Sequence, residues 1–154
     1  MIGAVGNDVF GKALTDNLKN ENIGIEGVDV INGSSGIAVI TVSGGDNTII
    51  LNKGANETVT TESIDRHIDL LRWADVVLMQ FEIPLETVLY AANSAKQLGK
   101  TVVINPAPIC DIPKELLTVC DLLIPNEHED AGIWAMKSLT KPPKRPSKTL
   151  SKKG

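Results

Sequence analysis

The stretch between residues 60 and 125 most constrains the fold, because short apolar runs alternate there with segments of helical periodicity. The apolar runs predict strands over 75–81, 101–105 and 121–125, and the periodic segments predict helices over 63–73, 85–98 and 113–119. The helix over 85–98 is the clearest, since Pro84 precedes it and Gly99 closes it. Strands separated by helices in this way are typical of a parallel sheet.

The first 56 residues have a different pattern. Residues 8–22 are predicted to form an amphipathic helix with Asp8 as its N-cap, followed by a strand over 25–31. Two β-like runs, 36–43 and 48–53, are joined by the short connection Gly-Gly-Asp-Asn. A connection of this length and composition predicts a β-hairpin.

Length and composition limit the classes of protein to consider. A chain of 154 residues with 42% hydrophobic and 22% charged residues is expected to fold as one globular domain. It has no apolar run of 18 residues and no signal-peptide pattern, so we expect a cytoplasmic protein without a membrane span. Cys110 and Cys120 are expected to be reduced thiols.

Charge is distributed unevenly along the chain. Residues 137–154 contain seven basic and no acidic side chains, whereas all 19 acidic residues precede them. Three prolines in this tail exclude a continuous helix, and we expect residues 131–154 to be disordered. The acidic body and an aromatic content of 3% argue against a nucleic-acid partner.

Polar residues follow each of the three strands predicted between 75 and 125. Glu82 follows the first strand, Asn105 the second, and Asn126 and Glu129 the third. Ligands of open parallel sheets bind beyond the carboxyl ends of the strands. We expect Glu82 and Asn126 to end neighbouring strands and to open onto one cavity beneath the hairpin.

The pattern alone leaves the role of each of these residues open. Glu82 could accept a hydrogen bond from a sugar hydroxyl or cap the helix that begins at 85. Asn105 is predicted to be a turn residue that satisfies backbone groups. Asn126 and Glu129 have the spacing Asn-x-x-Glu, which also fits a capping box.

Five segments resemble sequence motifs of the PfkB carbohydrate kinase family, as they occur in its ribokinase-type members. They are VGNDVFG (5–11), SGIAVITVSGGDNTIILNKGAN (35–56), LMQFEIPLE (78–86), VINPAP (103–108) and DLLIPNEHE (121–129). They occur in the family's order over residues 1–130. The chain therefore resembles the middle of such a kinase, truncated at both ends.

The resemblance implies an α/β fold with a partial ribokinase-like parallel sheet, flanked by helices, and a small β lid. The expected divisions are a core start over 1–35, the lid hairpin over 36–56, an α/β core over 57–130 and the basic tail. The implied activity is ATP-dependent phosphorylation of D-ribose to ribose 5-phosphate. Glu82 would bind the sugar hydroxyls, and Ala38 and Ile49 of the lid would press an apolar surface on the sugar.

The implied cofactors are ATP and Mg²⁺. Asn126 would contact ATP, and Glu129 would help organise magnesium and phosphate, which is the positioning that phosphoryl transfer requires. The lid would also form a homodimer contact.

This sequence departs from the family's pattern at both ends. The family's first strand, with its sugar-binding aspartate and Gly-Gly-Lys-Gly-Ala-Asn loop, is missing, and 52–56 is read as the lid's exit turn. The later Gly-Ala-Gly-Asp segment, with the catalytic base and anion hole, is also missing, as is the monovalent-cation site. We therefore expect the chain to be inactive alone. The alternative is a non-catalytic sugar-binding or dimerisation module derived from a sugar kinase.

Overall fold

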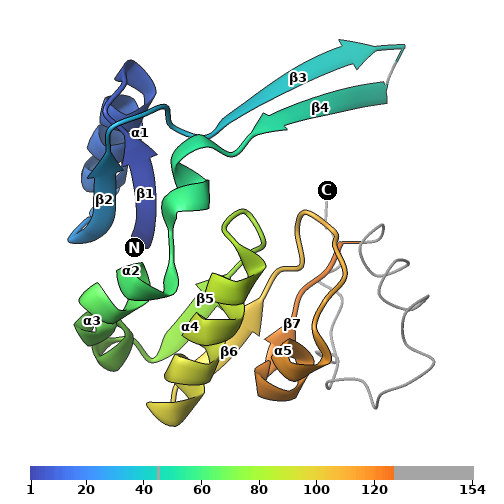
Figure 1. Ribbon diagram of the computed structural model, residues 1–154. Helices are drawn as coiled ribbons and strands as arrows, with labels where there is room; N and C mark the ends of the chain where they lie inside the picture. The colour runs from blue at the N-terminus through green and yellow to red at the C-terminus, as the bar shows by residue number, and fades with distance from the viewer. Residues whose placement is uncertain (45, 127–154) are drawn as a thin grey trace, which may run out of the picture.

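The computed structural model describes residues 1–44 and 46–126 of the chain. The elements in order are β1 (Ile2–Gly6), α1 (Val9–Asn20), β2 (Gly27–Ile31), β3 (Ile37–Ser43), β4 (Asp46–Asn52), the 3₁₀ helix η1 (Gly54–Thr58), α2 (Thr61–Arg66), α3 (Ile68–Trp73), β5 (Val76–Met79), α4 (Leu85–Gln97), β6 (Thr101–Ile104), α5 (Lys114–Val119) and β7 (Leu122–Leu123). The strands form a parallel pair, an antiparallel hairpin and a three-stranded parallel sheet (Figure 1). The predicted α/β class with a parallel sheet is confirmed.

The N-terminal part is a β–α–β unit that the sequence analysis recognised only in part. The N-cap of α1 is Asp8 as predicted, and its side chain accepts a hydrogen bond of 2.7 Å from the backbone N–H of Gly11. The strand β1 was not predicted. It pairs in parallel with β2, with Ile2 opposite Gly27 and Gly6 opposite Ile31.

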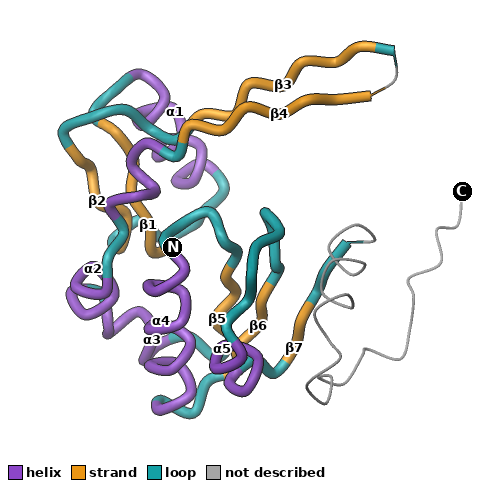
Figure 2. The backbone as a smooth tube through the Cα atoms, turned by 45° about the vertical axis from the view of Figure 1, so that its right-hand side comes forward, coloured by secondary structure: helices purple, strands orange, loops and turns teal. Residues whose placement is uncertain are grey.

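The predicted hairpin is present as β3 and β4. The two strands pair in an antiparallel register that runs from Ile37 opposite Asn52 to Ser43 opposite Asp46. The hairpin is a sheet of its own and projects from the body as a two-stranded arm in both views (Figures 1 and 2).

The sheet β5–β6–β7 follows the order of the chain, with β6 in the middle. Helices α4 and α5 lie side by side on one of its faces (Figure 1). The main hydrophobic core fills the space between them and the sheet, and its fully buried members include Val88 and Ala92 of α4 and Ile104 of β6.

The single helix predicted over 63–73 is instead two short helices, α2 and α3, that meet at His67. The break is associated with a tertiary contact. The side chains of Arg66 and His67 both reach the carboxylate of Asp29 on β2, at 2.6 Å and 3.3 Å. This contact joins the N-terminal unit to the helical layer.

Candidate functional site

The carboxyl ends of β5, β6 and β7 meet at one edge of the sheet. Met79, Ile104 and Leu123 are aligned in register across the three strands. Asn105 therefore lies one residue beyond the sheet, whereas Glu82 and Asn126 each lie three residues beyond it. In both views the hairpin extends over this edge of the sheet (Figures 1 and 2). We refer to this region as the strand-end region.

Three backbone hydrogen bonds connect the loops that leave these strands. The N–H of Asn105 donates to the carbonyl of Met79 at 2.9 Å, and the N–H of Phe81 donates to the carbonyl of Ala107 at 2.8 Å. On the other side, the N–H of Ile124 donates to the carbonyl of Ile104 at 2.9 Å. These bonds extend the pairing past the strands, so the positions of the polar residues that follow are fixed by backbone geometry.

Glu82 lies in the loop between β5 and α4 and is partly buried. Within the described part of the chain, its carboxylate has no hydrogen-bond or ion-pair partner. The N-cap of α4 is Pro84, and no side chain caps this helix. The capping role considered for Glu82 is therefore not observed, and its carboxylate remains available to accept hydrogen bonds from a ligand.

Asn126 does not lie on a strand next to the one that precedes Glu82, and this corrects the expected arrangement. Glu82 follows β5 and Asn126 follows β7, and β6 separates these strands because the sheet keeps the order of the chain. Asn126 is exposed at the end of the described region. Glu129, and with it the Asn-x-x-Glu spacing and the tail over 131–154, lies outside the described residues.

The side chain of Asn105 differs from the expected turn asparagine. Its Oδ1 atom is buried and has no hydrogen-bond partner among the described residues. A turn role would have used this oxygen to accept a backbone N–H. The sequence analysis named the residue but assigned it no ligand role, and its position between the loops of Glu82 and Asn126 was not evident from the pattern.

Ala38 and Ile49 lie on the same face of the hairpin. Ala38 pairs with Leu51 and Ile40 pairs with Ile49, and residues two apart along a strand share a face. Ala38 is exposed, and Ile49 is 51% exposed. The sequence expectation that both residues belong to one apolar surface therefore fits the register, whereas their contact with a sugar remains a prediction.

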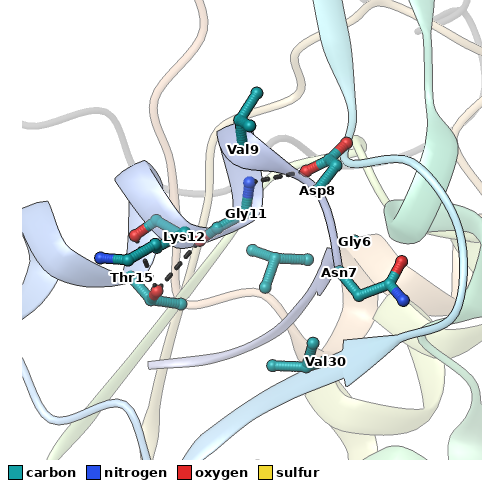
Figure 3. Close-up of a pocket in the computed structure, with 9 residues that line it drawn as sticks. Gly6, Asn7, Asp8, Val9, Gly11, Lys12, Thr15 and Val30 are labelled. Atoms are coloured by element: carbon teal, nitrogen blue, oxygen red, sulfur yellow. Dashed lines mark hydrogen bonds between the residues drawn. The ribbon is translucent and has the colours of Figure 1, made fainter.

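A concave region lies at the N-terminal unit, away from the predicted site residues. It is a cavity of about 430 Å³ between α1 and the strands β1 and β2 (Figure 3). The wall contains mainly small or apolar groups, including Val5, Val9 and Val30. Its polar residues Asn7, Asp8, Lys12 and Thr15 each already hydrogen-bond within the chain, so the cavity offers little for specific recognition.

The carboxylate of Asp8 accepts three hydrogen bonds, whereas the sequence pattern predicts for it only the role of a helix cap. It accepts from the backbone N–H of Ser35 at 2.8 Å, from Gly11 and from the Ser35 hydroxyl. These bonds, first of all the one from the Ser35 N–H, hold the pKa of Asp8 below its usual value. The apolar run 2–6 before it was the signal that could have identified β1.

The described residues contain no group of three or more potential metal-ligating side chains. Magnesium in kinases is usually held by one or two carboxylates together with substrate phosphates, so a magnesium site does not require such a group.

Both cysteines are free thiols, and burial raises the pKa of Cys120. No helix of the described chain has the length and apolar character needed to cross a bilayer.

Comparisons with known proteins give a consistent result. The family model described as pfkB family carbohydrate kinase matches residues 1–152. The ribokinase of Schizosaccharomyces pombe is 38% identical over 133 residues, which are 85% of this chain and 42% of that protein. The ribokinase of Lactococcus lactis is 37% identical over 129 residues, with coverages of 84% and 43%.

Solved structures agree with this. The ribokinase of Thermotoga maritima superposes with a TM-score of 0.78 at 33% identity, covering 88% of this chain and 44% of that one. The ribokinase of Arabidopsis thaliana, complexed with ribose and ATP, gives a TM-score of 0.76 at 32% identity, with coverages of 83% and 43%. The chain therefore spans less than half the length of the relatives it matches.

Proposed function

This chain belongs to the pfkB family of carbohydrate kinases, and we propose that it carries the lid and the sugar-binding part of a ribokinase-type enzyme. The complete reaction would transfer the γ-phosphoryl group of ATP to the 5-hydroxyl of D-ribose. The observation that carries the proposal is the Glu82 carboxylate, which is partly buried in the strand-end region without a partner in the described chain. The matched Arabidopsis ribokinase was solved with ribose and ATP.

The proposed sugar site combines one polar and one apolar surface. A partly buried carboxylate needs hydrogen-bond donors, and adjacent sugar hydroxyls supply two of them. Ala38 and Ile49 of the hairpin would cover the carbon face of the ring and exclude water from it. Such a division between a polar floor and an apolar cover gives both orientation and affinity.

The proposed nucleotide site lies on the other side of β6. Asn126 would contact ATP, and Glu129 would hold Mg²⁺ together with the phosphate oxygens. When bound, the ion neutralises the charge that develops on the transferred phosphoryl group. Asn126 and Glu82 lie at the two outer strands, so the sugar and the phosphates would meet above the end of β6.

We propose that this chain binds the sugar without turning it over. The family's Gly-Ala-Gly-Asp segment, with its catalytic base and anion hole, does not occur in the sequence. General-base assistance and oxyanion stabilisation each contribute orders of magnitude to a rate. A coupled assay with D-ribose, ATP and Mg²⁺ should therefore give no measurable turnover, and turnover at a normal kinase rate would contradict the proposal.

The sugar site is tested by calorimetric titration of the chain with D-ribose. Glu82→Gln should weaken ribose binding by about tenfold or more, since a hydrogen bond to a charged group contributes roughly 1.5–3 kcal/mol. The matched control is Glu86→Gln, because Glu86 is an exposed carboxylate on the first turn of α4. Unchanged affinity in Glu82→Gln, or an equal loss in Glu86→Gln, would exclude the assigned role.

The same titration distinguishes the sugars. A deoxyribokinase of Salmonella typhi is 35% identical over 132 residues, so 2-deoxy-D-ribose is the natural competitor. We propose ribose as the substrate and expect it to bind more tightly than 2-deoxy-D-ribose, because its additional hydroxyl can form a hydrogen bond in the strand-end region.

A further inference from the structure

The buried Oδ1 atom of Asn105 needs a hydrogen-bond donor that the described chain does not supply. We propose that Asn105 is a second polar contact for the sugar, in which its side-chain amide hydrogen-bonds a sugar hydroxyl beside the one bound by Glu82. This inference rests on the proposed function, because it extends the same sugar site from the loop after β5 to the end of β6.

Several backbone groups around Asn105 cannot donate to its side chain. The N–H of Asn105 itself donates to Met79, and the N–H of Ile124 on the adjacent strand donates to Ile104. Pro106 and Pro108 have no amide hydrogen. Within residues 1–44 and 46–126 nothing donates to this oxygen, and we assign the donor to a bound molecule.

Among the candidate ligands, the sugar is the one whose chemistry suits a hydrogen-bond donor to the Asn105 oxygen. An amide oxygen only accepts hydrogen bonds, and phosphate oxygens also act as acceptors, so the two cannot pair. A sugar hydroxyl both donates and accepts, and it can therefore satisfy either end of an asparagine amide. A water bound to Mg²⁺ is the other hydroxyl-type donor, and the experiment below separates these two sources.

The location of Asn105 suits a contact with the sugar. Asn105 is the first residue beyond β6, at the level of the sheet, whereas Glu82 lies farther out on the adjacent loop. Two backbone hydrogen bonds, Asn105 to Met79 and Phe81 to Ala107, connect these loops. The residue as a whole is only partly buried, and rotation about its broad terminal torsion can turn the oxygen outward toward a ligand.

The first experiment follows the Asn105 side chain directly by NMR. The chain is labelled with ¹⁵N-asparagine and ¹⁵N-glutamate, and the Asn105 side-chain amide and the Glu82 backbone amide are monitored during separate titrations with D-ribose and with MgCl₂. We expect ribose alone to shift both signals and MgCl₂ alone to leave Asn105 unchanged. A shift of Asn105 with MgCl₂ and not with ribose would overturn the assignment to the sugar.

The same titration separates this inference from the proposed function. A ribose-dependent shift at Glu82 without one at Asn105 overturns the inference alone. No ribose-dependent shift at either residue overturns the sugar site and the inference together.

The second experiment uses Asn105→Leu, which replaces the amide by an apolar group of similar size. Removing an unsatisfied buried acceptor should leave the urea midpoint unchanged or raised, while ribose affinity falls by about tenfold. The control is Asn93→Leu, because Asn93 is exposed on α4 and only bonds the carbonyl of Leu89. A lower midpoint with unchanged ribose affinity, or failure of Asn105→Leu to fold, would show a structural role and contradict the inference.

Discussion

At the scale of single residues, Asp8 connects three parts of the chain through one carboxylate. It caps α1 by accepting from Gly11, and it accepts from both the N–H and the hydroxyl of Ser35, the buried residue next to the start of the hairpin. The Ser35 oxygen in turn accepts from the N–H of Gly6 at 3.0 Å. Gly54 completes the base of the hairpin, since its φ of +50° and the nearby carbonyl of Ser35 leave no room for a side chain.

The stability of this junction should depend on pH. The pKa of Asp8 is lowered in the folded chain, first of all by the Ser35 N–H, so the contribution of Asp8 is complete above the unfolded value of about 3.9 and is lost as pH falls below it. Asp8→Asn should lower the free energy of unfolding at neutral pH. The difference between wild type and Asp8→Asn should then shrink below about pH 4.

Urea unfolding followed by circular dichroism at a series of pH values measures this difference. A constant difference between pH 7 and pH 3 would mean that the charge of Asp8 contributes nothing to folding. Asn can still cap a helix, so the loss at neutral pH reports mainly the bonds to Ser35.

At the scale of elements, the hairpin is apolar on both faces. Ile40 and Ile49 share one face and are 58% and 51% exposed, while Val39 and Ile50 share the other and are 54% and 64% exposed. A lid that covered only a sugar would need one apolar face, and an isolated two-stranded hairpin is marginal in water. We therefore propose that the second face forms the homodimer contact through the lid that the resemblance implies.

The two faces can be separated by substitution. Ile50→Lys should reduce self-association and leave ribose affinity unchanged, because it places a charge on the face opposite Ala38 and Ile49. Ile49→Lys should instead weaken ribose binding. Sedimentation velocity and ribose titration of both variants provide the measurement, and equal effects of the two substitutions on association would contradict separate roles for the faces.

Elements with strong local sequence signals were predicted correctly, whereas features that depend on contacts distant in the chain were not. The hairpin and α4 were predicted because their periodicity and their Gly or Pro boundaries are local signals. The strand β1 was missed because it has only five residues, two of them glycines, so that its apolar run is a weak signal. The break at His67 coincides with a contact to Asp29, which is distant in the chain. The lack of a partner for Asn105 Oδ1 within the described chain could not be predicted either, because it depends on the three-dimensional positions of neighbouring donors.

At the scale of the whole molecule, the two faces of the three-stranded sheet have different surroundings. Helices α4 and α5 cover one face, whereas Val76, Leu78 and Ile124 remain 55%, 62% and 39% exposed on the described chain. Parallel sheets are normally covered on both faces. The matched region covers less than half of the length of these relatives, and we propose that the additional length of such an enzyme covers this surface. Exposed apolar surface of this kind favours self-association.

Val76 and Val77 are adjacent residues of β5 on opposite faces of the sheet, so the same substitution at each position compares the two faces. Val76 is exposed, whereas Val77 is partly buried against the main core. Val76→Thr should reduce binding of the dye ANS and change the free energy of unfolding by less than about 0.5 kcal/mol. Val77→Thr should lower that free energy by roughly 1–2 kcal/mol, because its hydroxyl is placed among apolar side chains. Equal destabilisation by both substitutions in urea titrations would mean that the second face is also covered in solution. In the absence of other proteins, only a second copy of this chain could cover that face. A dependence of the unfolding free energy on protein concentration would then identify self-association as the cause.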